Sequence, residues 1–508
     1  MKRFRLLHQP ILKYIHRLKI FNMNESLLKL QPSEIWHYFK EILAVPRPSK
    51  KEEKIIAYIL DFGKKHQLET LQDEVGNILI RKPATKGMEN RKMVVLQSHV
   101  DMVCEKNSDK VHDFEKDPIE ARIIKGWVHA TGTTLGADDG IGIAAQLAIL
   151  ASDEIEHGPI ECLFTVDEET GLTGAFGLKT GFLKSEILLN LDSEDEGQIF
   201  IGCAGGRDTI AWLPYDKEAT PDGYKAFKVM VSGLKGGHSG DDINKGLGNA
   251  NKILNRFLYQ IKDKFNCKLN TFDGGNLRNA IAREAFAIIL VPEENVEKVK
   301  TELNQFTVDI KAEYNKSDPN IEINISSTKL PDFCADDESV DYLLKAVYAC
   351  PHGVIAMSQD IKDFVETSTN LASVKFGDDE ILITTSQRSS VESAKIDVCN
   401  MVESVFKLAG GRVEHSSGYP GWKPNPDSKI VALTVESYKK LFGNSPEVLA
   451  IHAGLECGLI GNVYPTMDMT SFGPTIKGAH SPDERIEIES VQKFWDLLLD
   501  VLKNIPAR

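Results

Sequence analysis

Runs of apolar residues alternate with segments of helical periodicity along the first part of the chain. Short apolar runs occupy Met93–Gln97, Ile160–Val166 and Ile187–Leu191, and such runs are typical of buried strands. Lys51–His66 instead shows an apolar face opposite Lys and Glu, which predicts an amphipathic helix. Ile141–Ala151 is apolar on nearly every side and predicts a buried helix. Strands that alternate with helices in this way predict an α/β domain with a mostly parallel sheet.

The pattern changes after Gly205. A first βαββαβ-like unit is predicted from strands at Tyr224–Gly233, Asn279–Pro292 and Asn320–Ser327 and from helices at Gly246–Ile261 and Glu294–Asn315. A second, similar series follows, with helices at Glu338–Tyr348 and Val391–Ala409 and strands at Glu366–Phe376, Glu380–Gln387 and Gly411–Ser416. Both series mix strands and helices as α+β domains do.

These patterns predict two domains and a short appendage. Residues 23–205 and 419–508 would form the two segments of the α/β domain, and residues 206–418 an inserted α+β domain of ferredoxin-like βαββαβ units. The two halves of the inserted domain share little sequence, so an internal duplication stays an open alternative. A chain of 508 residues is also too long for a single hydrophobic core.

Residues 1–22 carry six Lys or Arg and no Asp or Glu. Three interpretations stay open: a transit peptide, an amphipathic helix that lies on a surface, or a chain whose true first residue is Met23. The stretch has no signal-peptide apolar region. We expect an appendage that takes no part in the chemistry.

Composition excludes several classes of protein. The net charge of −14 argues against a nucleic-acid-binding protein, which needs a basic surface. The eight cysteines are dispersed and form no CxxC pair, which is typical of a reduced, cytoplasmic protein. No apolar run approaches the ~20 residues that span a membrane. We therefore expect a cytoplasmic protein with neither a nucleic-acid nor a membrane partner.

Polar residues follow the predicted strands at similar places. His99 and Asp101 come directly after one apolar run, Glu168 and Glu169 after the next, and Asp192 after the third. Each group alone is more often a set of solvated loop residues. In open α/β sheets, however, ligands bind beyond the carboxyl ends of the strands, so these residues are expected to converge.

Two further residues complete this set. Asp138 lies in the glycine-rich stretch TGTTLGADDGIG, and His480 lies in the loop GAHSPDE. Histidine and carboxylate ligands together suit Zn²⁺ or Mn²⁺, with Co²⁺ as a substitute. Carboxylates that crowd together need cations, and two metal ions about 3.5–4 Å apart on a shared carboxylate would meet that need.

The order of several motifs now gives a resemblance. SHVD, TLGADDGIG, DEETG, LLNLDSE, GLKGGHSG, LRNAIARE, IHAGLECG and GAHSPDE occur in that order. From about Gln31 to the C-terminus, the chain resembles the aminoacyl-histidine dipeptidase, or cytosol non-specific dipeptidase, family of two-zinc metallopeptidases. The resemblance implies a zinc-peptidase catalytic domain with an inserted lid domain, two Zn²⁺ per subunit, and a homodimer formed through the lid.

The resemblance also implies a set of metal ligands. His99 and Asp192 would hold one ion, and Glu169 and His480 the other. Asp138 would bridge the two ions. Asp139 departs from the family pattern, which usually has an amide there, and we expect it to lie behind the ligands or in solvent.

Other roles follow from the same resemblance. Asp101 would orient the ring of His99. Glu168 would be the general base, which takes a proton from water and returns it to the leaving amine. Because the Glu168–Glu169 pair follows an apolar strand, we expect a non-helical turn there, in which the two side chains point apart.

In the lid domain the resemblance implies a catalytic histidine and a substrate site. His238 would polarise the scissile carbonyl and stabilise the oxyanion. Asn279, Arg388 and Gly454 would bind substrate, with the planar guanidinium of Arg388 suited to a free carboxylate. His452 is expected behind the site and not as a ligand.

We therefore expect hydrolysis of dipeptides of broad scope, including Xaa-His, to free amino acids. The alternative enzymes are an N-acyl-amino-acid amidohydrolase or a tripeptidase on the same scaffold. A non-catalytic binding protein is the alternative from another class, but no residue of the ligand set is missing.

Overall fold

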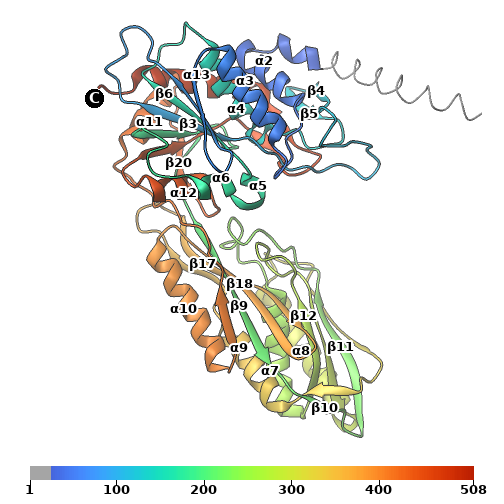
Figure 1. Ribbon diagram of the computed structural model, residues 1–508. Coiled ribbons are helices and arrows are strands. Elements are labelled where there is room, and N and C mark those ends of the chain that lie inside the picture. The colour runs from blue at the N-terminus through green and yellow to red at the C-terminus, as the bar shows by residue number, and fades with distance from the viewer. Residues whose placement is uncertain (1–23) are drawn as a thin grey trace, which may run out of the picture. The chain divides into compact units, whose positions relative to one another are not determined.

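The computed structural model describes residues 24–508, which divide into two compact units (Figure 1). One unit comprises the described residues up to Gly202, together with Asn425–Leu449 and Leu459–Arg508. The second comprises Cys203–Pro424 and Ala450–Gly458. This division differs from the expected one mainly at Ala450–Gly458, which groups with the second unit. The basic stretch 1–22 lies outside the described residues.

The first unit contains an eight-stranded sheet in the order β1-β2-β6-β3-β7-β21-β8-β20. Its strands are β1 (Glu69–Gln72), β2 (Ile78–Lys82), β3 (Val94–His99), β6 (Ile160–Thr165), β7 (Ile187–Asn190), β8 (Gln198–Cys203), β20 (Glu447–Ile451) and β21 (Asp468–Ser471). The central strands β6, β3, β7 and β21 run parallel, whereas β1, β2 and β8 pair antiparallel. The expectation of a mostly parallel sheet is thus correct for the centre and wrong for the edges.

The helices of the first unit complete its core. They are α2 (Ser33–Leu43), α3 (Glu53–Lys65), α4 (Ala137–Ala151), α11 (Lys429–Phe442) and α13 (Ile488–Asn504), and α12 (Glu456–Val463) begins in the second unit. Helix α4 packs on β3 and α2, while α11 packs on β21 and α13. Every residue of α4 from Ala137 to Leu150 is buried, as its apolar sequence predicts.

A four-stranded sheet flanks the loop that contains His480. It has the order β22-β23-β5-β4, from β4 (Ala121–Ile124), β5 (Trp127–Ala130), β22 (Ile476–Lys477) and β23 (Arg485–Glu487). The antiparallel pair of β22 and β23 brackets residues 478–484. This loop therefore starts and ends on paired strands.

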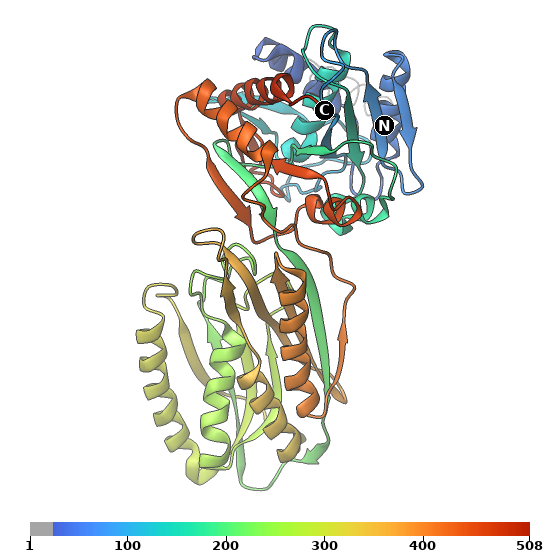
Figure 2. The ribbon, with the colours of Figure 1, turned by 90° about the vertical axis from the view of Figure 1, so that its left-hand side faces the viewer.

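The second unit contains a large antiparallel sheet with helices on one face (Figure 2), and a short two-stranded sheet of β10 (Lys217–Ala219) and β15 (Phe333–Ala335). The order of the large sheet is β14-β11-β13-β12-β17-β18-β9-β19, and β16 (Gly353–Met357) pairs with β17. The other strands are β9 (Gly205–Pro214), β11 (Tyr224–Ser232), β12 (Lys268–Gly274), β13 (Ala285–Pro292), β14 (Glu322–Ser327), β17 (Val365–Phe376), β18 (Glu380–Ser389) and β19 (Arg412–His415). The helices are α7 (Ala250–Phe265), α8 (Val296–Glu313), α9 (Asp337–Ala349) and α10 (Glu392–Leu408).

The topology of this sheet is duplicated. The series β11-α7-β12-β13-α8-β14 and β9-α9-β17-β18-α10-β19 are both βαββαβ units with the same strand order, and they join where β12 pairs with β17. The duplication that the sequence left open is therefore present. Strand β9, the first strand of the second βαββαβ repeat, was not predicted. The whole first repeat separates it in sequence from the other elements of the second repeat.

Among residues 24–508, no helix is both long and apolar enough to cross a lipid bilayer.

Candidate metal centre

The expected ligands of the first unit lie beyond the carboxyl ends of neighbouring strands. His99 is the last residue of β3, Asp192 follows β7, and Glu169 follows β6 in the single-turn helix α5 (Glu168–Gly171). Asp138 lies in the first turn of α4, and His480 in the loop between β22 and β23. Because β6, β3 and β7 are parallel neighbours, their ends meet at one edge of the sheet.

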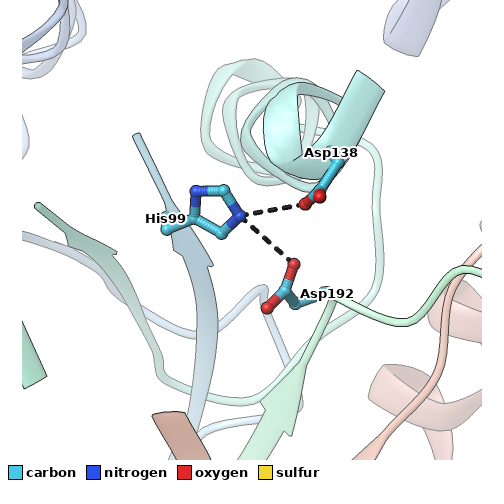
Figure 3. A group of neighbouring side chains, drawn as sticks. All are labelled: His99, Asp138 and Asp192. Carbon is cyan, nitrogen blue, oxygen red and sulfur yellow. Dashed lines mark hydrogen bonds and ion pairs between the residues drawn. The ribbon is translucent and has the colours of Figure 1, made fainter. Parts of the chain in front are cut away.

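Asp138 lies between the two histidines. Its Oδ1 atom is 3.0 Å from Nε2 of His99, and its Oδ2 atom is 3.2 Å from Nε2 of His480. Figure 3 shows His99 between Asp138 and Asp192, whose Oδ1 atom lies 3.4 Å from Nε2 of His99. On the other side, Oε2 of Glu169 lies 3.0 Å from Nε2 of His480. Two ligand groups thus share Asp138, and within each group the ligand atoms lie within 4.8 Å of one another.

The electrostatics of this cluster call for positive charge. Burial alone would lower the pKa of His99, but Asp192, Asp101 and Asp138 outweigh that effect and raise it well above its usual value. Contacts with Asp138 and Glu169 raise the pKa of His480 to about 11. Oε1 of Glu169 is buried and has no hydrogen-bond partner among the described residues. The residues present therefore fit divalent cations.

Asp101 connects His99 to the glutamate pair. Its Oδ1 atom lies 3.3 Å from Nδ1 of His99 and accepts a 3.0 Å hydrogen bond from the main-chain N–H of Glu168. Its Oδ2 atom accepts hydrogen bonds from the Glu169 N–H (3.3 Å) and the Ser49 hydroxyl (2.8 Å). One buried carboxylate thus fixes both the ring of His99 and the start of α5. The expectation of a non-helical turn at Glu168–Glu169 was wrong, because both residues belong to that short helix.

Asp139 lies behind this cluster and not in solvent. Its side chain is almost fully buried, and Oδ1 accepts a 3.2 Å hydrogen bond from the N–H of Gly142. Burial and the nearby carboxylate of Asp192 raise the pKa of Asp139 well above its usual range. Of the two positions expected for this residue, the buried one is therefore correct.

Two buried residues that no sequence pattern indicates hold the loops of the candidate ligands. Glu484 accepts hydrogen bonds from the main-chain N–H groups of residues 135–138, the last of which is that of Asp138. Arg47, between α2 and α3, donates to main-chain carbonyls on both sides of the site, including that of Asp101. Arg47 lies in the stretch VPRPS and Glu484 in the loop GAHSPDE, but no local pattern assigns these contacts to them.

The expected substrate residues lie in the second unit, where His238 and Asn279 are neighbours. Nδ1 of His238 is 3.3 Å from Oδ2 of Asp241. The main-chain carbonyl of Asn279 accepts a 2.8 Å hydrogen bond from the N–H of Ser239. The loops that contain His238 and Asn279 therefore run side by side.

Arg388 lies in a buried polar group of the same unit. It is 8% exposed and donates to the Tyr419 hydroxyl at 3.1 Å, yet its Nε atom has no partner among residues 24–508. Gly454 packs so closely on Tyr419 that an added Cβ would lie 2.9 Å from the ring. His452 accepts or donates a 2.7 Å hydrogen bond with Ser368. An unpaired buried guanidinium nitrogen favours an anion as its partner.

Comparisons with known proteins point to the same kind of enzyme as the cluster of candidate metal ligands. The model of peptidase family M20/M25/M40 matches residues 95–504, which is most of the chain. The chain belongs to this family. This M20 peptidase is therefore a peptide hydrolase of a metallopeptidase family, and the resemblance drawn from its motifs is confirmed.

Two relatives match nearly the whole M20 peptidase. The cytosol non-specific dipeptidase of Escherichia coli (strain K12) is 48% identical over 483 residues, which covers 95% of this chain and 100% of the relative. The crystal structure of aminoacylhistidine dipeptidase from Vibrio alginolyticus matches with a TM-score of 0.89 and 45% identity, over 95% of this chain and 98% of that one. A tripeptidase from Staphylococcus aureus has a TM-score of 0.59 at 17% identity, over 94% and 99% of the two chains, and this likeness shows the fold alone.

Proposed function

We propose that this M20 peptidase hydrolyses dipeptides to free amino acids and uses two Zn²⁺ ions per chain. The observation that carries the proposal is Asp138, whose two carboxylate oxygens face the two histidines His99 and His480. His99, Asp138 and Asp192 would hold one ion, and Asp138, Glu169 and His480 the other. When bound, such a pair supplies Lewis-acid activation of water and of the peptide carbonyl. Co²⁺ or Mn²⁺ would be substitutes for Zn²⁺.

Glu168 is the proposed general base. It begins α5, and Asp101 fixes its main-chain N–H. A carboxylate held there would take a proton from the attacking water and return it to the leaving amine, as general acid–base catalysis requires. Glu169, the next residue, points its Oε2 atom at His480, so the two glutamates have separate tasks.

The second unit is proposed to recognise the substrate. The free carboxylate of the dipeptide would pair with Arg388, whose buried Nε atom has no partner among the described residues. His238 would stabilise the oxyanion that forms at the scissile carbonyl. Asn279 and Gly454 would line the rest of the substrate site.

The proposed substrates are dipeptides of broad scope, including Xaa-His. The printed names of the two close relatives, a non-specific dipeptidase and an aminoacylhistidine dipeptidase, support this scope. A panel of dipeptides, tripeptides and N-acyl amino acids would test it, since an amidohydrolase would prefer the acylated amine and a tripeptidase three residues.

Glu168→Ala is the direct test of the mechanism. The substitution should lower kcat by about 10²- to 10⁴-fold, because it removes the base, while zinc content stays unchanged. Glu154→Ala is a matched control, since it removes an exposed glutamate of the same unit. Normal turnover by the Glu168 variant would refute the assignment of the base.

We also propose a cytoplasmic enzyme that forms a homodimer through the second unit. All eight cysteines are free, which supports a reducing compartment. The dimer follows from the family resemblance, and sedimentation equilibrium would test it: a monomer at micromolar concentration would contradict the proposal.

A further inference from the structure

The carboxylate of Glu484 lies beneath the loop that leads into Asp138. It accepts hydrogen bonds from four successive main-chain N–H groups, those of Leu135 (2.6 Å), Gly136 (2.9 Å), Ala137 (2.7 Å) and Asp138 (3.3 Å). Glu484 is 2% exposed. Four convergent N–H donors form a strong site for a negative charge, and here that charge belongs to the chain itself.

Arg47 holds the same loop from its carbonyl side. Its guanidinium donates to the carbonyls of Val100 (3.0 Å), Asp101 and Gly136, and the residue is 2% exposed. Gly136 has a φ of 70°, and a Cβ there would lie 2.6 Å from a guanidinium nitrogen of Arg47. The glycine is therefore needed for this close approach. Arg47 thus connects the segment after His99 to the segment before Asp138.

The two candidate ion sites differ in how their ligands are held. His99 ends β3 and Asp192 follows β7, so hydrogen bonds between central strands fix both. His480 lies in a loop, has a left-handed φ of 62°, and its side chain is 54% exposed. Four residues later, Glu484 ties that loop to the backbone of Asp138. Glu484 therefore supports two ligands of the His480 site, Asp138 and His480 itself, but only Asp138 of the His99 site.

We propose that Arg47 and Glu484 are positioning residues of the metal centre, and that Glu484 acts mainly on the ion held by Asp138, Glu169 and His480. This inference rests on the proposed two-metal function. Glu484 hydrogen-bonds the main chain of Asp138 and belongs to the loop of His480, and it acts through these two connections. Groups that orient metal ligands from behind typically change metal affinity by about 10- to 100-fold.

Zinc titration of the full-length protein tests the proposal. Metal-free protein is titrated with Zn²⁺ in competition with a chromophoric chelator, for the wild type, Glu484→Gln and Glu487→Gln. Glu487 is the matched control, because it is a partly exposed glutamate three positions further along. In the Glu484→Gln variant an NH₂ group replaces one acceptor oxygen against the N–H groups, so the second equivalent of zinc should bind about 10- to 100-fold more weakly. The first equivalent, and both equivalents in Glu487→Gln, should bind as in the wild type.

Cobalt provides a second readout. The visible absorption of the second Co²⁺ equivalent should change in Glu484→Gln, because its ligands are displaced, while that of the first stays the same. Wild-type affinities and spectra in this variant would overturn the proposal. An equal loss at both sites, together with earlier urea unfolding of the metal-free variant, would also overturn it, since that result indicates a general structural role.

Glu484→Asp keeps the test decisive if the Gln variant does not fold. It retains the charge but shortens the reach, so a smaller, still selective loss at the second equivalent is expected, and equal or unchanged affinities would overturn the proposal. A wild-type protein that binds fewer than two zinc ions, or that hydrolyses no dipeptide, would instead contradict the proposed function. The two failures are therefore distinguishable.

Discussion

The polar clusters of the two units shift the pKa of a histidine in opposite directions. In the first unit, contacts with Asp138 and Glu169 raise the pKa of His480 to about 11. In the second unit, burial and the nearby Arg388 lower the pKa of His452 to about 3. One cluster therefore has a surplus of carboxylates and favours cations. The other has a buried guanidinium whose Nε atom has no hydrogen-bond partner among residues 24–508, and it favours an anion.

This difference separates two tasks of a peptidase. Metal binding needs carboxylates and neutral imidazoles, whereas recognition of a free carboxylate needs a fixed cation. In this chain the candidate metal ligands belong to the first unit and Arg388 belongs to the second, so the two sets of groups come from different parts of the fold.

Removal of the shared carboxylate should have the largest effect. Asp138→Ala takes a ligand from both candidate ion sites, so zinc content should fall below one ion per chain. The loss of several kcal/mol of transition-state stabilisation would lower kcat/KM by about 10³-fold or more. Metal analysis and dipeptide hydrolysis of the purified variant would check both results.

Asp139→Asn is the matched control for that variant. Asn has the same shape as Asp, and its side-chain oxygen can still accept the hydrogen bond from the N–H of Gly142, so the amide should be tolerated. Zinc content should stay near the wild-type value. If Asp139→Asn lost both ions and Asp138→Ala kept them, the bridging role would belong to Asp139.

The cation of the second unit gives an intermediate effect. Arg388→Met should raise KM for dipeptides by about 10- to 100-fold, since it removes charged hydrogen bonds to the substrate carboxylate. Dipeptide amides lack that carboxylate, so the wild type should hydrolyse them poorly and the variant should no longer discriminate. Arg278→Met, which removes an exposed arginine paired with Asp208, should leave the KM for dipeptides and the KM for dipeptide amides unchanged. Retained discrimination in Arg388→Met would place carboxylate recognition elsewhere.

Three of the candidate metal-ligand positions can be found in the sequence because they follow apolar runs. His99, Asp192 and the Glu168–Glu169 pair directly follow strands that one apolar pattern reveals, and parallel strands bring such ends together. Their roles came from the order of the motifs, which no single spacing provides. The local apolar pattern thus indicates His99, Glu168, Glu169 and Asp192, whereas Asp138 and His480 were added from their own motifs.

Local sequence patterns do not predict contacts with main-chain groups that lie far away in the chain. Glu484 accepts hydrogen bonds from N–H groups of residues 135–138, which lie far away in the chain. Nothing in the sequence around Glu484 distinguishes it from a solvent-exposed glutamate of a loop. Strand β9 was missed for a related reason, because its partner β18 follows long after it. The parallel character of the sheet was overestimated, since apolar runs do not reveal the direction of a strand such as β2, which pairs antiparallel with β6.

The smallest expected effect concerns the stability of the second unit at low pH. Unfolded His452 would take up a proton near pH 6.5, but the folded side chain does so only near pH 3. The unfolded state therefore binds more protons between these values, so stability falls as the pH drops below about 6.5. At pH 5 the loss amounts to at most about 2 kcal/mol, because each pH unit contributes ~1.4 kcal/mol.

Urea unfolding of metal-free protein at pH 7.5 and pH 5 would measure this loss without interference from metal release. His452→Gln cannot take up the proton, so its free energy of unfolding should fall less between the two pH values than that of the wild type. His37→Gln, at a half-exposed position of the first unit, should keep the wild-type dependence. Equal pH dependence of His452→Gln and the wild type would mean that folding does not lower the pKa of His452. The side chain would then be protonated at pH 5 in the folded state, and the second cluster would hold an additional positive charge there.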